Sequence, residues 1–315
     1  YCAQASTMPS LEEIENISYT AKTVRCGGCS NNCMLTVNTF PGGRKHITGN
    51  RCEKGLGEKV AAKASNMVEY KRNRIFGYEP LSEAEAFRGT IGIPRVLNIY
   101  ENYPFWAVFW KKLGFRVIIS PFSSRKIYEM GMESIPSESE CYPAKLAHGH
   151  VEWLIQNGMK TIFHPCVFYE RQEVEGAQNH YNCPIVVSYS ENLKNNVESV
   201  TLGEVKYLRP FLAFTSETTV ADRMVRVCEE VWNISEKEVR EAVSEAWQEQ
   251  LRAKQDIRQE GKRLFEKIQK EQAGGIILTG RPYHIDPEIN HGIPEMIASY
   301  GLTVFTEDSI PEEFE

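Results

Sequence analysis

The feature that most constrains the fold is an alternation of short apolar segments and amphipathic segments that begins near residue 93. The apolar segments are rich in Val and Ile and have the length of strands, whereas the segments between them have a helical period. This alternation is typical of a parallel sheet covered by helices. The expected strands are residues 95–100, 116–121, 161–164, 184–189, 275–279 and 302–306, and the expected helices are residues 105–113, 144–157 and 295–300.

A long charged stretch with helical character separates the first four of these strands from the last two. We therefore predict an α/β protein with Rossmann-like parallel-sheet lobes joined by a linking helix. Because the chain starts with Tyr1 and stops soon after a core strand, we expect a piece of a longer protein with a truncated second lobe. The expected parts are a polar tail (1–20), a cysteine module (21–57), a linker (58–92), a first lobe (93–235), the linking helix (236–272) and the start of a second lobe (273–315).

The cysteine module holds four of the nine cysteines, Cys26, Cys29, Cys33 and Cys52, with the spacing C-x2-C-x3-C-x18-C. Residues 34–40 alternate like a strand, Pro-Gly-Gly forms a turn, and residues 46–48 suit a return strand. A hairpin brings its ends together, so Cys52 is expected beside the other three thiols. The spacing predicts a metal site and leaves two alternatives open, a structural zinc and a [4Fe–4S] cluster.

A second candidate site comprises Cys141 and Cys166. Pro143 suits the first turn of a helix, so Cys141 is expected at the N-terminus of that helix, where the free amides favour a thiolate. Cys166 follows the expected strand 161–164. Helix N-termini and strand C-termini share one edge of an open parallel sheet, so the two thiols can meet there. The alternative is that both are ordinary half-buried cysteines.

The remaining cysteines and the histidines carry weaker signals. Cys183 precedes the expected strand 184–189, which places it at the opposite edge of the sheet, and Cys228 lies on a helical pattern and is expected in the core. His148 and His150 are two residues apart on a helix and face different sides, so each is expected to be packed rather than catalytic. His164 could line the same edge as Cys166.

Several classes of function lack support in the sequence. The net charge is -6 and no basic stretch offsets it, which argues against nucleic acid. No apolar run approaches the roughly 18 residues of a membrane span, and no secretion signal is visible. We therefore expect a cytoplasmic protein whose cysteines are reduced or bound to metal. No phosphate loop, dinucleotide-binding fingerprint or G-x-S-x-G turn occurs.

Several motifs together resemble one family. They are IYENYPFW (99–106), SESECYPAK (137–145), FHPC (163–166), GRPYHIDPEINHGIPE (280–295), TEDS (306–309) and the N-terminal cysteine module. The combination is similar to proteins related to 2-hydroxyacyl-CoA dehydratases and their activases, namely the DUF2229-type domain of large CoA-enzyme-activase-like proteins, which are related to double-cubane cluster proteins. The resemblance covers roughly residues 20–310.

The resemblance implies an ATP-dependent activase that passes low-potential electrons to an iron–sulfur partner with two Rossmann-like lobes. Cys141 and Cys166 match first-lobe ligands of a [4Fe–4S] or double-cubane cluster, with the remaining ligands beyond residue 315. The activase domains are expected on the same parent chain, and the substrate would be an acyl-CoA or another small molecule. The truncated chain is expected to be inactive alone.

Two hypotheses follow. The first is an iron–sulfur electron-transfer or reductase component, in which Cys26, Cys29, Cys33 and Cys52 form an accessory relay or structural site. The alternative is a non-catalytic, zinc-containing α/β scaffold within a larger multidomain protein. Iron and sulfide content discriminates between them.

Overall fold

The computed structural model describes residues 10–27, 32–50, 55, 64–173 and 176–311. The chain divides into two compact units, Tyr1–Lys63 and Ala64–Glu315, and each is described by itself. Within the described part, no helix is long and apolar enough to cross a membrane. Cys29 and Cys52, half of the predicted four-cysteine site, lie outside the described residues.

The first unit contains a three-stranded antiparallel sheet in the order β1-β2-β3. Its predicted hairpin is confirmed, with β2 at Met34–Thr39, β3 at Lys45–Thr48, and the 3-10 turn η1 at Pro41–Gly43 between them. Two elements were not predicted, the short helix α1 (Leu11–Glu15) and strand β1 (Thr20–Arg25). Strand β1 is almost entirely exposed, so its sequence lacks the apolar alternation that marks a half-buried strand.

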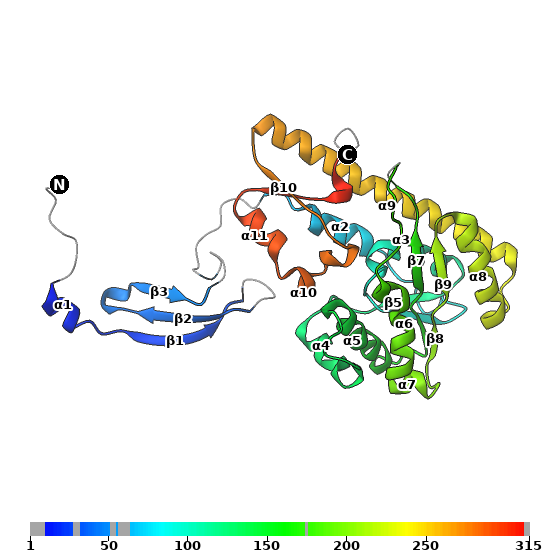
Figure 1. Ribbon diagram of the computed structural model, residues 1–315, viewed down its shortest axis with the longest axis horizontal. Helices are drawn as coiled ribbons and strands as arrows, with labels where there is room; N and C mark the ends of the chain where they lie inside the picture. The colour runs from blue at the N-terminus through cyan, green and yellow to red at the C-terminus, as the bar shows by residue number, and fades with distance from the viewer. Residues whose placement is uncertain (1–9, 28–31, 51–54, 56–63, 174–175, 312–315) are drawn as a thin grey trace. The chain divides into compact units, whose positions relative to one another are not determined.

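The second unit is built on a four-stranded parallel sheet in the order β5-β4-β6-β8, whose outer strands β5 and β8 are labelled in Figure 1. A separate parallel pair, β7 with β9, continues beyond it. The core is dominated by aromatic residues of α3, and Trp106 and Trp110 both pack against Phe163 of β6. The strands are β4 (Thr90–Ile93), β5 (Arg116–Ile119), β6 (Thr161–Phe163), β7 (Cys166–Glu170), β8 (Lys206–Leu208) and β9 (Phe211–Phe214).

Helices connect these strands, as the alternation predicted. Helix α3 (Ile99–Lys112) joins β4 to β5; α4 (Arg125–Gly131), the 3-10 turn η3 (Met132–Ser134) and α5 (Tyr142–Gln156) join β5 to β6. Helices α6 (Pro184–Asn196) and α7 (Glu198–Thr201) lie between β7 and β8, and α8 (Glu217–Trp232) follows β9. The fold class predicted from sequence is therefore confirmed.

Two predicted strands of the first lobe are wrong. The strand expected at residues 95–100 lies earlier, at Thr90–Ile93, and α3 already begins at Ile99. The strand expected at residues 184–189 is the start of α6, with Pro184 in the first helical turn. Its Ile-Val-Val run favours a strand, but Val186, Tyr189, Ser190 and Leu193 are buried with a helical spacing. Packing of this face overrode the β propensity of the run.

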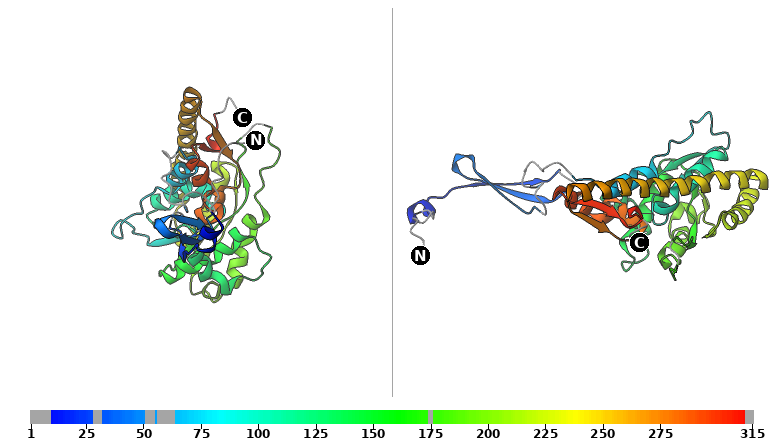
Figure 2. Two further views of the ribbon diagram at one scale, coloured as in Figure 1. Left: turned by 90° about the vertical axis from the view of Figure 1, so that its left-hand side faces the viewer. Right: turned by 90° about the horizontal axis from the view of Figure 1, so that it is seen from above.

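The linking helix is confirmed as α9 (Glu236–Glu271), which Figures 1 and 2 show as one continuous helix. It packs against α3, α8 and the helix α2 (Met67–Phe76). Near its end, Gly261 lies against the 3-10 turn η5 (Glu307–Ser309), where a Cβ would come within 1.9 Å of the Ser309 carbonyl oxygen. A glycine is therefore needed for this close approach.

The predicted beginning of a second sheet is also present. Strands β10 (Gly275–Leu278) and β11 (Thr303–Thr306) are parallel, and between them lie the 3-10 turn η4 (Pro282–Ile285) and the helices α10 (Pro287–Asn290) and α11 (Ile293–Ser299). On its other side β11 pairs with Asn66, just before α2. Buried Lys71 of α2 forms an ion pair with Asp308 at 2.8 Å, which fastens α2 to the end of β11.

Candidate functional site

The candidate site lies at the edge of the first sheet where its parallel strands end. Cys141 is the N-cap of α5 and is exposed to solvent, as the Pro143 signal predicted. Helix α5 runs back to the start of β6, so its N-terminus lies at the carboxyl edge of the strands. The Cys141 thiol accepts no capping hydrogen bond from the first amides of α5.

Cys183 lies at the same edge, because it is the N-cap of α6. The prediction that placed it at the opposite edge is wrong, since it depended on a strand where the chain forms a helix. Helix α6 leads through α7 to the start of β8, so its N-terminus faces the same way as that of α5. Burial raises the pKa of Tyr283, and the nearby thiols of Cys183 and Cys141 raise it further. Both thiols therefore lie within electrostatic range of one tyrosine.

Cys166 has a different environment. It begins β7, is fully buried, and its Sγ lies 2.8 Å from Ser190 Oγ of α6. Burial raises the pKa of its thiol. Its backbone N–H donates to the Pro210 carbonyl. The structure thus gives Cys166 a partner inside the fold, and its predicted role as a ligand together with Cys141 stays a prediction.

The segment after β10 carries Tyr283 and is held by Asp286. Asp286 is fully buried, and its Oδ2 accepts hydrogen bonds from the Tyr100 hydroxyl and the Ser123 backbone N–H. Its Oδ1 caps α10 by accepting from the amides of Glu288 and Ile289. In addition, the Tyr142 hydroxyl, next to Cys141, donates to Glu288 at 3.0 Å. The Asp286-Pro287 pair predicts the start of a helix. No local pattern in the sequence predicts the hydrogen bonds that Asp286 accepts from Tyr100 and Ser123.

Histidines surround the edge and are packed, as expected. The two ring nitrogens of His150 lie 2.8 Å from Ser120 Oγ and 2.9 Å from Ser123 Oγ, and burial lowers its pKa to about 3. Ser120 Oγ also accepts from the Arg95 backbone N–H, and the neutral imidazole donates from one ring nitrogen and accepts at the other. Burial also lowers the pKa of His148 to about 4 and that of His164 to about 3. All three imidazoles are therefore neutral near pH 7.

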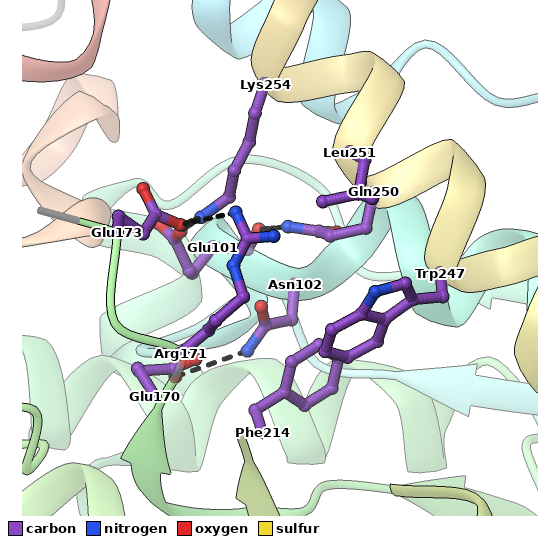
Figure 3. A pocket seen from close by; sticks show the side chains of 10 residues that line it. All are labelled: Glu101, Asn102, Glu170, Arg171, Glu173, Phe214, Trp247, Gln250, Leu251 and Lys254. Carbon is purple, nitrogen blue, oxygen red and sulfur yellow. Dashed lines mark hydrogen bonds and ion pairs between the residues drawn. The ribbon is translucent and has the colours of Figure 1, made fainter. Parts of the chain in front are cut away.

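A small cavity of about 110 Å³ lies at the far end of β7 (Figure 3). The Oε1 atom of Glu170 accepts hydrogen bonds from the side-chain amides of Asn98, Asn102 and Asn182. Burial, with the Glu101 carboxylate nearby, raises the pKa of Glu170 to about 7. Since Asn182 precedes Cys183, this carboxyl group also helps to hold the loop that begins α6. Sequence reasoning missed Glu170, because its three partners are spread over distant segments.

The described residues supply an incomplete ligand set for a metal or cluster. Among them, no group of three or more His, Cys, Asp or Glu side chains could hold a metal ion together. The sheet edge provides two thiols, Cys141 and Cys183, so a closed shell there needs further ligands. In the N-terminal module the Cys26 backbone N–H donates to the Cys33 carbonyl at 2.8 Å, which holds two predicted ligands in one loop. The four-cysteine site stays a prediction.

Comparison with known protein families identifies the family of this chain. The family described as CoA enzyme activase uncharacterised domain (DUF2229) matches residues 90–310, which is more than half of the chain. The chain belongs to this family. No curated protein and no solved structure gives a match. The DUF2229 match runs from β4 to the end of η5, so it includes the three parallel sheets of the described residues, α9 and the thiol edge, and leaves out the cysteine module.

Proposed function

We propose that this DUF2229 chain is an iron–sulfur electron-transfer component of a CoA enzyme activase-type protein. It would receive low-potential electrons from an ATP-dependent activase domain and pass them to a small substrate such as an acyl-CoA. The observation that supports this proposal is the pair of thiols at the N-termini of α5 and α6, at the edge where open parallel sheets bind ligands. The family membership supports the association with activases.

In this proposal Cys141 and Cys183 would hold one side of an iron–sulfur cluster, whose contribution is to store and release single electrons. Both residues lie at N-cap positions, so their thiols project from the ends of two helices toward one edge. Asp286 holds the segment that carries Tyr283 through its bonds to Tyr100 and Ser123. Cys166 remains the third candidate thiol, and to bind iron it would have to exchange its contact with Ser190 for a metal bond.

The N-terminal module has an accessory role in this proposal. Cys26, Cys29, Cys33 and Cys52 would bind either a structural zinc ion or a [4Fe–4S] cluster that relays electrons. Its strands belong to the first unit, which lies outside the residues that DUF2229 matches. An accessory role is consistent with this separation.

The test is metal analysis of the full-length protein purified without oxygen. Iron and acid-labile sulfide should be present in near-equal amounts, and Cys141→Ser and Cys183→Ser should each lower the iron content. The matched control is Cys228→Ser, because Cys228 is fully buried on α8, away from the edge. Cys166→Ser decides whether that thiol is a further ligand. Iron content that is unchanged in both edge variants would refute the proposed site.

The second candidate function is a non-catalytic zinc-containing scaffold. It is favoured by the incomplete donor set, since the described residues offer two thiols at the edge rather than a closed shell. A colourless protein that contains zinc and no iron would support this alternative and exclude electron transfer.

A further inference from the structure

A second cavity lies at the carboxyl ends of β10 and β11, and its lining includes neither Cys141 nor Cys183. Its volume is about 250 Å³. Its walls are aliphatic side chains contributed by α2, β10, η4, α10 and the start of α11: Val68, Leu278, Ile285, Ile289, Ile293 and Pro294. In open parallel sheets ligands bind at this edge of the strands, and an apolar pocket with a few polar groups is the usual form of a small-molecule site.

The polar groups that line this cavity are mainly hydrogen-bond donors. Asn290 Oδ1 accepts from the Gly292 backbone N–H at 2.9 Å, whereas Asn290 Nδ2 is buried and has no partner. Leaving a buried donor unsatisfied costs about 1–3 kcal/mol, so such an atom indicates a missing acceptor. This orphan donor is the observation that distinguishes the cavity from a simple apolar void.

His284 and Arg281 add two further donors to the same cavity. His284 Nδ1 accepts from the Arg281 backbone N–H at 3.2 Å, and burial with the Arg281 charge lowers the pKa of the ring. The neutral imidazole therefore carries its proton on Nε2. Gly280 is needed for this arrangement, because a Cβ there would lie 2.2 Å from His284 Nδ1.

The charges favour an anionic ligand. The Arg281 guanidinium is exposed and forms no ion pair with the residues that the structure describes. The one acidic residue in the lining, Glu307, lies 3.9 Å from the Lys71 ammonium, which offsets its charge. The cavity thus combines an aliphatic interior with an unpaired cation, a neutral imidazole donor and an amide donor without a partner.

We propose that this cavity binds a small organic carboxylate. The aliphatic part of the ligand would lie among Leu278, Ile289 and Ile293, and its carboxylate would accept from Asn290 Nδ2 and the imidazole, with Arg281 supplying positive charge. The volume exceeds the 150 Å³ or so of an engineered cavity that binds benzene, so an unbranched acid of about six carbons fits. The lining of the cavity does not include Cys141 or Cys183. Failure of the binding test would therefore leave the proposed electron transfer unaffected, and the reverse also holds.

Isothermal titration calorimetry with hexanoate, hexan-1-ol and hexylamine tests the proposal. Hexanoate is expected to bind with a Kd of about 1 mM or below, and hexylamine at least about tenfold more weakly. Arg281→Gln should weaken hexanoate binding by about tenfold, as expected for loss of a charged partner. The matched control is Arg223→Gln at an exposed position of α8, where the guanidinium forms no ion pair with the residues that the structure describes, and this variant should leave binding unchanged.

A charge reversal provides the sharper variant. Asn290→Asp keeps the acceptor for the Gly292 N–H and replaces the orphan donor by a carboxylate oxygen, and circular dichroism checks that the variant is folded. It should weaken hexanoate by at least about tenfold and strengthen hexylamine. Three outcomes would each overturn the proposal: no saturable binding of hexanoate, equal affinity for hexanoate and hexylamine, or variants at Arg281 and Asn290 that behave like Arg223→Gln.

Discussion

The edge cysteines and the core cysteines of the second unit provide an instructive contrast. Cys141 and Cys183 occupy the N-cap positions of two helices at the carboxyl edge of the sheet, and neither thiol makes a capping hydrogen bond. Cys166 and Cys228 are fully buried, and burial raises the pKa of both, that of Cys228 to about 12. In the sequence all four are isolated cysteines. Their position in the fold decides which thiols are accessible, since Cys141 is exposed and Cys183 is half-buried.

The largest expected effect is on alkylation of the folded, metal-free protein by iodoacetamide at pH 7.5. Exposed Cys141 should react far faster than Cys228, because Cys228 is fully buried and its pKa, three units above the ordinary value of 9.0, leaves it about a thousandth of the thiolate of an ordinary thiol. Mass spectrometry of peptides at successive times measures each site. Comparable alkylation rates for Cys228 and Cys141 would contradict the difference between the core cysteines and the edge cysteines.

The next effect concerns Asp286, whose hydrogen bonds with Tyr100 and Ser123 hold the segment that carries Tyr283. Asp286→Asn weakens the bonds from Tyr100 and Ser123 to a fully buried carboxylate and should lower the free energy of unfolding by about 2–4 kcal/mol. It should also change the alkylation rates of Cys141 and Cys183 while Cys166 stays protected. Urea titration measures the stability. The control is Asp222→Asn, an exposed partner of Arg240, which should cost about 1 kcal/mol or less.

A smaller effect is a pH dependence of stability that comes from Glu170, whose carboxyl group holds the loop before Cys183. The pKa of Glu170 is raised from 4.5 to about 7, so the folded state retains this proton to higher pH than the unfolded state. The associated stability is fully present below pH 4.5 and is lost as the pH rises through about 7. Glu170→Gln should therefore be more stable than the native protein at pH 8, by about 1–3 kcal/mol, and equally stable at pH 4.5.

Thermal or urea unfolding across this pH range measures the difference. Glu230→Gln, on the exposed face of α8, is the matched control and should leave the slope of stability against pH unchanged. A Glu170 variant with the slope of the native protein would show that this carboxyl group does not retain its proton in the fold.

The smallest expected effect is at the core partner of Cys166. Ser190→Ala removes the hydroxyl that contacts Cys166 Sγ and should cost about 1 kcal/mol. The alkylation rate of Cys183, seven residues earlier on the same helix, should not change. A thermal melt and the alkylation assay together check this, and a faster Cys183 would show that the edge and core thiols are coupled.

Local signals in the sequence predicted a good part of the fold. Pro143 after Cys141 marked the start of α5, the charged periodic stretch marked α9, and the Val/Ile runs marked β10 and β11. Strands β7, β8 and β9 were missed, although β7 is longer than β6, which was predicted. Helix α6 was mistaken for a strand because its first turn is β-branched. In each missed case the decisive contacts come from residues distant in the chain, as between Cys166 and Ser190.

By itself the sequence determined the alternation of strands and helices, the capping position of Cys141 and the motifs shared with the DUF2229 family. These features depend on neighbouring residues, whose propensities and spacings can be recognised along the chain. Only the tertiary structure decided that Cys183 joins Cys141 at one edge, that Cys166 is enclosed, and that Asp286 holds the segment that carries Tyr283. The physical reason is that burial, and the pKa shifts that follow from it, depend on the direction in which each helix packs and on contacts between segments far apart in sequence.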